Sequence, residues 1–255
     1  MANTVYDNKI IEAKAKDLLT TAINTRNLMT VDNTLAESAG MTKTINVYTY
    51  TGTAEELANG EGNKTRGSIS FDGKDYTVKR VQANFDYTDD DFMKDNSVVD
   101  NGVAGATAIL KNKMNADFFA ECAKASLSVP GALSYDTIVD AIAELNVEDE
   151  SKIFVVIPND QKALLRKDPD YVAARMGDVV YTGQVGTVCG IPVIASKAAD
   201  APYVMTPDAV KLFIKKDIGV GQERDEDTTV NSVYIRAYYI AALQDATKIC
   251  KIANA

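Results

Sequence analysis

Carboxylates form the densest group of potentially reactive side chains in this sequence of 255 residues. Five aspartates fall within ten positions, and neighbouring carboxylates can bind a divalent cation or exchange protons with a substrate. Their order does not follow the D-x-[DN]-x-[DN]-G pattern of a calcium loop. Because carboxylates also favour the first turn of a helix, we predict a solvated linker and a helix start here, with a metal site as the alternative. The five residues are Asp86, Asp89, Asp90, Asp91 and Asp95.

Histidine and cysteine usage restricts the remaining chemistry. The chain has no histidine, which excludes Ser-His and Cys-His dyads and imidazole metal ligands. Cys122, Cys189 and Cys250 are far apart and form no CxxC pair, so we expect neither a zinc site nor a disulfide framework. All three are predicted to be buried packing residues in a protein of a reducing compartment. We therefore assign no catalytic, cofactor-binding or metal-binding residue and expect no cofactor.

Glycine-rich stretches do not indicate a phosphate site. Gly183, Gly186 and Gly190 lack the Gly-Lys-Ser/Thr ending of a phosphate loop, so we interpret them as turn glycines. The pair Gly219 and Gly221 precedes the acidic run 223–227, which would repel a phosphate.

Overall composition excludes further classes. The net charge of −9 opposes a dedicated nucleic-acid reader, since such domains usually have a basic face. The longest apolar run, residues 237–243, is far shorter than the roughly 18 residues of a membrane helix. The first helix-like stretch is charged and lacks the apolar centre of a signal peptide. We expect a globular protein that neither crosses a membrane nor is secreted.

The first third of the chain predicts projecting elements. Residues 10–23 have apolar residues at helical spacing and predict an amphipathic helix that must dock on another surface. Residues 27–42 predict an extended arm, and residues 44–50 alternate as a strand does. The helical stripe consists of Ile11, Ala15, Leu18 and Ala22, widened by Ile10, Leu19 and Ile23.

Residues 43–85 predict a long two-stranded excursion. Residues 59–67 contain three glycines and no apolar residue. Asp72-Gly73 lies between two β-type runs and predicts a hairpin turn, because glycine accepts positive φ. An isolated hairpin is marginal in water, so we expect this one to lean on another surface. An ordinary edge hairpin on its own domain is the alternative.

The rest of the chain predicts one long helix, then an α/β region and a β-rich end. The long helix is expected over about residues 100–126. Ser134 suits a helix N-cap, followed by the apolar face of Ile138, Val139, Ile142 and Leu145. Residues 153–157 predict a buried strand ended by Pro158, and a short helix follows through residues 163–165. Further strands are predicted around residues 179–181, 185–188, 191–195, 210–214, 233–239 and 249–252.

Four stretches stand out by their order and spacing. They are residues 52–61; residues 138–142 with 155–158 and 164–167; residues 186–194 (GTVCGIPVI); and residues 223–225 with 234–242 and 245–246. Together they resemble the major capsid protein of tailed double-stranded-DNA bacteriophages, whose Hong Kong 97-like capsid fold is shared by encapsulins. In that comparison the first stretch is like the tip of the family's extended loop, the second like its axial domain, the third like its G-x-x-x-G-I-P-V turn and strand, and the last like its closing peripheral strands.

The resemblance implies an α+β fold in four parts. An N-terminal helix and arm would occupy residues 1–40, and an extended β-hairpin loop residues 41–88. A peripheral domain with a long spine helix would combine residues 89–131 and 206–255. An axial α/β domain would occupy residues 132–205. No long charged helical region precedes the arm, so no fused scaffolding domain is expected.

The resemblance implies a structural protein and no enzyme. Copies of the chain would self-assemble as pentamers and hexamers into an icosahedral shell around packaged double-stranded DNA, bound non-specifically. The shell would form in the host bacterial cytoplasm and become the virion capsid. Portal, separate scaffolding and decoration proteins are further partners that it implies. Some relatives cross-link a loop lysine, but Lys64, Lys74 and Lys79 are ordinary for a solvated loop, so no cross-link site is assigned.

Two alternatives remain open. An encapsulin-type nanocompartment shell would use the same fold around an enzyme. A carboxylate-based hydrolase, a different class, could use two of the 36 acidic residues, although nothing in the sequence singles out a pair.

Overall fold

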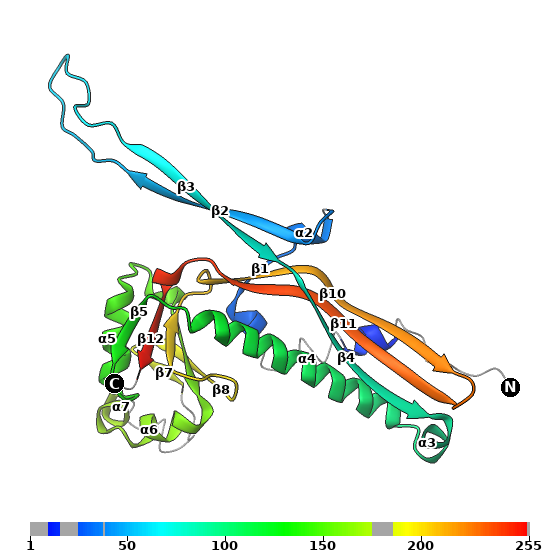
Figure 1. Cartoon of the computed structure of the whole chain (residues 1–255). Coiled ribbons are helices and arrows are strands. Elements are labelled where there is room, and N and C mark those ends of the chain that lie inside the picture. Colours follow the sequence, from blue (N-terminus) through cyan, green and yellow to red (C-terminus); the bar gives the residue numbers. More distant parts are fainter. Residues whose placement is uncertain (1–9, 16–24, 38, 175–185, 254–255) are drawn as a thin grey trace.

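The computed structural model describes residues 10–15, 25–37, 39–174 and 186–253. It contains a four-stranded sheet, a six-stranded sheet and a two-stranded ribbon. Figure 1 shows the four-stranded sheet lying along one long helix, the six-stranded unit at one end of that helix, and the ribbon projecting from the body.

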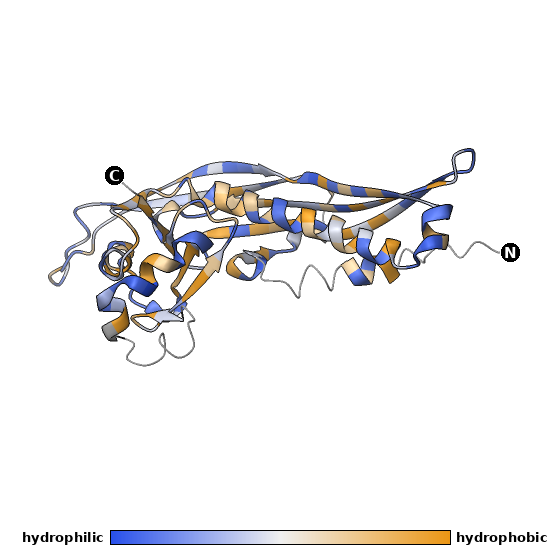
Figure 2. Ribbon diagram, turned by 90° about the horizontal axis from the view of Figure 1, so that it is seen from below, coloured by the Kyte–Doolittle hydropathy of each residue, from blue (hydrophilic) through white to orange (hydrophobic). Residues whose placement is uncertain are grey.

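The four-stranded sheet has the order β1-β10-β11-β4. Its long strands are β10 (Val210–Asp225), β11 (Val230–Leu243) and β4 (Lys79–Thr88), and the short β1 (Thr30–Asp32) pairs in parallel with β10. Helix α4 (Val98–Cys122) covers one face, and the short α3 (Asp89–Lys94) precedes it. Viewed from the helix side in Figure 2, the strands show alternating hydrophilic and hydrophobic bands, as expected for a sheet with one covered face.

Helix α4 confirms the predicted stripe. Six of its seven predicted residues are buried; Ala125 lies beyond the end of the helix and is half-buried. The six are Val103, Ala106, Leu110, Met114, Phe118 and Cys122. They pack on one face of β11, whose alternation is also confirmed: Val233, Ile235, Ala237 and Tyr239 are buried.

The six-stranded sheet has the order β5-β12-β9-β6-β8-β7. Its buried centre is β6 (Phe154–Pro158), as predicted. The other strands are β5 (Leu127–Pro130), β7 (Thr187–Val188), β8 (Ile191–Ser196), β9 (Tyr203–Met205) and β12 (Ile249–Ala253). Helix α5 (Tyr135–Leu145) begins at Ser134, whose hydroxyl and Thr137 form a capping box. Helices α6 (Lys162–Lys167) and α7 (Pro169–Ala174) follow β6.

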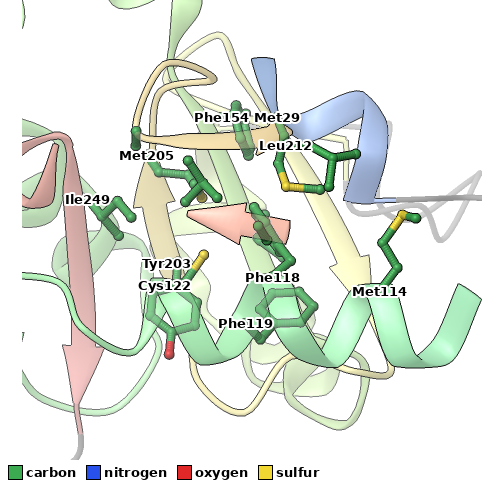
Figure 3. Packing of buried hydrophobic residues seen from close by; sticks show 14 of the residues in the cluster. Met29, Met114, Phe118, Phe119, Cys122, Phe154, Tyr203, Met205, Leu212 and Ile249 are labelled. Atoms are coloured by element: carbon green, nitrogen blue, oxygen red, sulfur yellow. The ribbon is translucent and has the colours of Figure 1, made fainter. Parts of the chain in front are cut away.

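One cluster of buried residues connects α4 with both large sheets. Figure 3 shows Phe118, Phe119 and Cys122 of α4 directed toward side chains from β9 and β12. Phe118 and Phe119 pack edge to face, with ring centroids 5.0 Å apart, and Phe119 stacks on Tyr203 of β9. The single helix therefore anchors two sheets that have different strand topologies.

The ribbon consists of β2 (Thr42–Thr51) and β3 (Ser68–Thr77), joined by residues 52–67. The predicted turn at Asp72-Gly73 is wrong. Strand β3 runs straight through both residues, and Gly73 pairs with Asn46. The local Asp-Gly signal is overridden because ten consecutive cross-strand pairs place the reversal at residues 52–67, where Gly60 has the positive φ of +89°.

Several smaller predictions also need correction. The arm at residues 27–42 is not simply extended: it contains the 3-10 helix η1 (Thr25–Leu28), strand β1 and the short helix α2 (Thr34–Glu37). Ile10 is 61% exposed because only Ile11 and Ala15 of residues 10–15 face α4. Val139, which was predicted to lie on the buried face of α5, is 36% exposed. Ala141 is buried on that face instead.

The last strand joins an unexpected sheet. Strand β12 pairs with β5 and β9 in the six-stranded sheet, not with the closing strands of the four-stranded sheet. Residues 16–23 of the first predicted helix, the strand at 179–181, Gly183 and Val185 lie outside the described residues.

Candidate assembly surface

The base of the β2–β3 ribbon is attached to its own subunit. The ring of Tyr76 stacks on Phe213 with centroids 6.1 Å apart, and its hydroxyl donates to the carbonyl oxygen of Leu243 at 2.9 Å. The Lys43 ammonium donates to the Thr34 hydroxyl at 3.1 Å. The ribbon therefore leaves the body from a fixed base.

The distal part of the ribbon carries an exposed apolar patch. The cross-strand register pairs Tyr48 with Phe71 and Tyr50 with Ile69. Because paired residues share a face and side chains alternate along a strand, all four lie on one face of the ribbon. They are 62–70% exposed, and the Tyr48 and Phe71 rings lie 6.0 Å apart. We call Tyr48, Tyr50, Ile69 and Phe71 the ribbon patch.

The opposite face of the distal ribbon is polar. Thr49 pairs with Ser70, and Thr51 pairs with Ser68 through hydroxyls 2.8 Å apart. A ribbon with one apolar and one polar face has the pattern of a strand pair that covers a surface on one side only. The sequence reasoning missed the ribbon patch, although the period-two spacing of Tyr48 with Tyr50 and of Ile69 with Phe71 was available to find it.

The tip, residues 52–67, has local order without a core. The Glu55 carboxylate accepts hydrogen bonds from the backbone N–H groups of Lys64 and Thr65, at 2.7 and 2.9 Å. These bonds hold the pKa of Glu55 below its usual range. The N–H of Glu61 donates to the carbonyl oxygen of Ala58 and closes a turn at Gly60. The tip thus keeps a shape that it could present to a partner.

The acidic group begins a helix, as predicted. Thr88 and Asp91 form a capping box at the start of α3, and Asp95 bonds Ser97 ahead of α4. The Asp89 carboxylate pairs with both terminal nitrogens of Arg224 and accepts from the Asn231 amide. These contacts lower the pKa of Asp89, with Arg224 the largest cause. Among the described residues no group of three or more Cys, Asp or Glu has the arrangement of a metal site.

Two of the three cysteines occupy the predicted environment. Cys122 and Cys250 are buried, and burial raises the pKa of both thiols, that of Cys250 to about 11. The prediction for Cys189 is wrong. Cys189 is exposed in the two-residue turn between β7 and β8, with its sulfur 3.2 Å from the Tyr135 hydroxyl.

The remaining sequence candidates lie apart. Lys64 is in the tip, Lys74 pairs across the ribbon with Ile45, and Lys79 begins β4. Gly190 has φ +81° in the β7–β8 turn, while Gly219 and Gly221 lie inside β10. No helix of the described residues is long and apolar enough to cross a membrane.

The combination of a spine helix under a long sheet, a separate α/β unit and a projecting ribbon defines a shell-forming capsid protein of the Hong Kong 97-like class. Residues 72–252 match the family profile described as "Phage capsid protein". This chain therefore belongs to the phage capsid protein family, whose members are structural components of the virion.

Individual comparisons agree with this family. The chain is 25% identical over 235 residues to the major capsid protein of Staphylococcus phage phiMR11, covering 87% of this chain and 84% of the relative. A solved structure from Mycobacterium phage Che8 superposes with a TM-score of 0.69 at 17% identity, covering 89% of each chain. A virus-like particle from Pyrococcus furiosus has a TM-score of 0.65 at 10% identity, covering 98% of this chain and all of the other.

Proposed function

We propose that this chain is the repeating subunit of an icosahedral shell around double-stranded phage DNA, and that its role is structural and not enzymatic. Pentamers and hexamers would tile the shell, and the ribbon patch would be a principal contact between subunits. The observation that carries the proposal is the exposure of four large apolar side chains on one face of a ribbon.

Burial of the ribbon patch against a neighbouring subunit would supply the driving force for assembly. A two-stranded ribbon is marginally stable alone in water, so its distal part gains order from a covering surface. Each large apolar side chain that becomes fully buried contributes about 1.5–3 kcal/mol. A contact between different surfaces of identical copies closes into a ring or a shell when its rotation allows.

The further partners follow from the family and from charge. Portal, separate scaffolding and decoration proteins would complete the particle in the host bacterial cytoplasm. A chain with a net charge of −9 neutralises few phosphates, which supports non-specific and weak contact with the packaged DNA.

The domain division is also proposed. We assign residues 1–40 to the arm, 41–88 to the extended loop, 89–131 with 206–255 to the peripheral domain and 132–205 to the axial domain. The strand pairing favours two changes: residues 127–130 and 249–253 hydrogen-bond within the six-stranded sheet and belong with the axial domain.

The fold alone does not separate a phage capsid from an encapsulin-type shell, because the resemblance implies the same fold for both. A virus-like particle from Pyrococcus furiosus also superposes over 98% of the chain. The family profile and the curated relative favour the phage capsid. Particles isolated from infected cells should contain nuclease-protected double-stranded DNA. A protein cargo without DNA would favour the nanocompartment instead.

The first prediction tests the ribbon patch by a double substitution. Tyr50→Lys with Ile69→Glu places a charge pair on the patch at one cross-strand rung. Since the pair can form a salt bridge across the ribbon, the subunit should fold normally. An apolar surface on the neighbouring subunit would offer these charges no partner and would remove them from water. Closed shells should therefore be absent in electron micrographs.

The control places the same charge pair on the neighbouring rung and the other face. Thr49→Lys with Ser70→Glu should still give shells. Equal assembly by both variants, with both folded by thermal melts, would show that the ribbon patch is not a subunit contact.

A further inference from the structure

The face of the four-stranded sheet opposite α4 gathers positive charge. Tyr234, Arg236 and Tyr238 of β11 point to this face, since the alternate residues of β11 are buried against α4. The register adds Arg80 and Gln82 from β4, and Lys216, Gly219 and Gly221 from β10. No carboxylate occupies these three rungs of the sheet. We call Arg80, Lys216 and Arg236, with the two tyrosines, the basic face.

Gly219 in β10 leaves room for the Lys216 side chain to lie along this face. A Cβ at Gly219 would meet the Lys216 side chain at 2.9 Å, and one at Gly221 would lie 3.8 Å from the Arg236 guanidinium. Arg236 also lies over the Tyr234 ring, 5.4 Å from its centroid, and its Nε donates to Gln82 Oε1 at 2.8 Å. Glycine inside a strand marks a place where another group approaches closely, and here that group is a cation.

The far end of the same sheet is strongly acidic. Residues 86–95 and 223–227 hold nine carboxylates against two cations, Lys94 and Arg224. Arg224 is already paired with Asp89 and Glu226. Glu226 is 79% exposed at its side chain, and Asp227 is exposed beside it in the β10–β11 turn. We call these two segments the acidic end.

Within one subunit the acidic end meets the basic face only at its edge, where the Tyr234 hydroxyl donates to the Glu223 carboxylate at 3.5 Å, while Glu226 and Asp227 lie beyond that edge in the β10–β11 turn. Both surfaces belong to the same continuous strands: Asp86 and Glu223 follow the basic rungs directly, on the same face. A sheet backed by a 25-residue helix cannot fold onto itself. The cations Arg80, Lys216 and Arg236 and the turn carboxylates Glu226 and Asp227 can therefore meet only between molecules.

We propose that the basic face is a docking surface for the acidic end of a second copy of this chain. This inference rests on the proposed shell, adding a second contact that is polar and independent of the ribbon patch. Because the two complementary surfaces are different, the contact is head-to-tail and can close into a ring or a shell. Charge complementarity of this kind selects the register of an interface and suppresses wrong neighbours.

Nucleic acid is the less suitable occupant of the basic face. A duplex extends over many phosphates, and the carboxylates of Asp86 and Glu223 at the next rung would repel the phosphates beyond the three cations. The exposed β10–β11 turn presents Glu226 and Asp227 at one point, so it can contact the three cations without extending over the neighbouring carboxylates as a duplex would.

Charge reversal and its rescue test the contact. Arg80→Glu with Lys216→Glu reverses the basic face at two exposed side chains, and Glu226→Lys with Asp227→Lys reverses the acidic end. Each double variant should lower the yield of closed shells by at least about tenfold, because like charges then face each other. All four substitutions in one chain restore complementarity and should recover shells. Lys167→Glu with Lys197→Glu, exposed cations of the six-stranded unit, is the matched control and should assemble normally.

Thermal melts, electron microscopy and titration of a fluorescent DNA duplex provide the readouts. The two end substitutions lie in an exposed turn, so their result stands even if a face variant folds poorly. Normal shells from the folded end variant, or no recovery in the folded fourfold variant, would overturn the contact. Tight duplex binding that is lost with the face variant, while its shells persist, would overturn it in favour of nucleic acid. The ribbon-patch variants separate this outcome from a failure of the proposed shell.

Discussion

At the scale of single residues, Cys189 shows how a turn constrains its side chain. Cys189 and Gly190 join β7 to β8 with φ of +50° and +81°. Two successive positive φ values define a type I′ turn, which matches the twist of the strands and favours Asn-Gly. Cysteine carries a Cβ and is strained in this region. The exposure of Cys189 therefore follows from its position at a turn, which its hydrophobic character did not predict.

Substitution of this residue should stabilise the subunit. Cys189→Asn should raise the free energy of unfolding by about 0.5–1 kcal/mol, because asparagine adopts positive φ more readily. Urea unfolding of the reduced protein measures the change. Gly190→Ala is the opposite case and should destabilise, since alanine is strained at that φ. A loss of stability in Cys189→Asn would mean that the lost contact with Tyr135 outweighs the relief of backbone strain at positive φ.

Asp89 gives a pH-dependent contribution to stability. Arg224 and Asn231 lower its folded pKa from the ordinary value of 3.8. A carboxylate with a depressed pKa contributes stability that is fully present above its unfolded pKa and is lost as pH falls through its folded pKa. Asp89→Asn should therefore be less stable than wild type at pH 7, and the difference should shrink below pH 3.8.

Thermal melts across pH 2.5–7, a range about the unfolded pKa of aspartate, measure this difference. Asp90→Asn, an exposed neighbour in the same first turn, is the control and should differ little from wild type at either extreme. If the stability difference between Asp89→Asn and wild type stays constant with pH, the hydrogen bonds of Asp89 stabilise the fold independently of its charge.

At the scale of elements, the ribbon depends on its base for attachment and on its distal part for contact. Tyr76 and Ile45 pack against Phe213, while the four residues of the ribbon patch are 62–70% exposed. Most of the stability therefore comes from α4 and the two larger sheets.

Replacing the tip should separate folding from assembly. A short Gly-Ser linker in place of residues 54–65 should leave a soluble subunit whose melting temperature lies within about 4 °C of wild type, since little apolar area is lost. Closed shells should not form. Leu145→Asp is the contrasting variant: Leu145 is 6% exposed, and an unpaired buried charge there should cost about 4 kcal/mol or more and unfold the subunit. Shells from the tip variant, or unfolding by it, would contradict the assignment.

The elements that the sequence predicts best are those whose periodicity reports burial directly. Three such features are the stripe of α4, the N-cap at Ser134 and the apolar run of β6, and each depends on neighbours close in sequence. The turn at Asp72-Gly73 failed because its local preference competes with a ten-residue register, and the ribbon patch was missed because exposed apolar residues in a strand resemble core residues in sequence. The basic face depends on pairing between β4, β11 and β10, which no local pattern reveals.

At the scale of the whole molecule, two units share one helix and exchange strands across long sequence distances. The family resemblance in the sequence predicted this arrangement as a whole, and the family profile confirms the resemblance. What it did not predict was the sheet that the last strand joins, because the paired residues of β12 and β5 lie 123 positions apart in the sequence, with Lys251 opposite Ser128 and Ile252 opposite Val129.

The placement of β12 determines when the six-stranded sheet can be completed during translation. The residues of β5 are synthesised 123 positions before the residues of β12 with which they pair. Until then the edge of β9 also lacks its neighbour. Pairings of such long sequence separation form late, because the intervening loop must be closed first. We therefore expect a nascent chain to complete its six-stranded sheet only after residues 249–253 have emerged, and we expect association of half-made copies on one messenger RNA to be delayed until then.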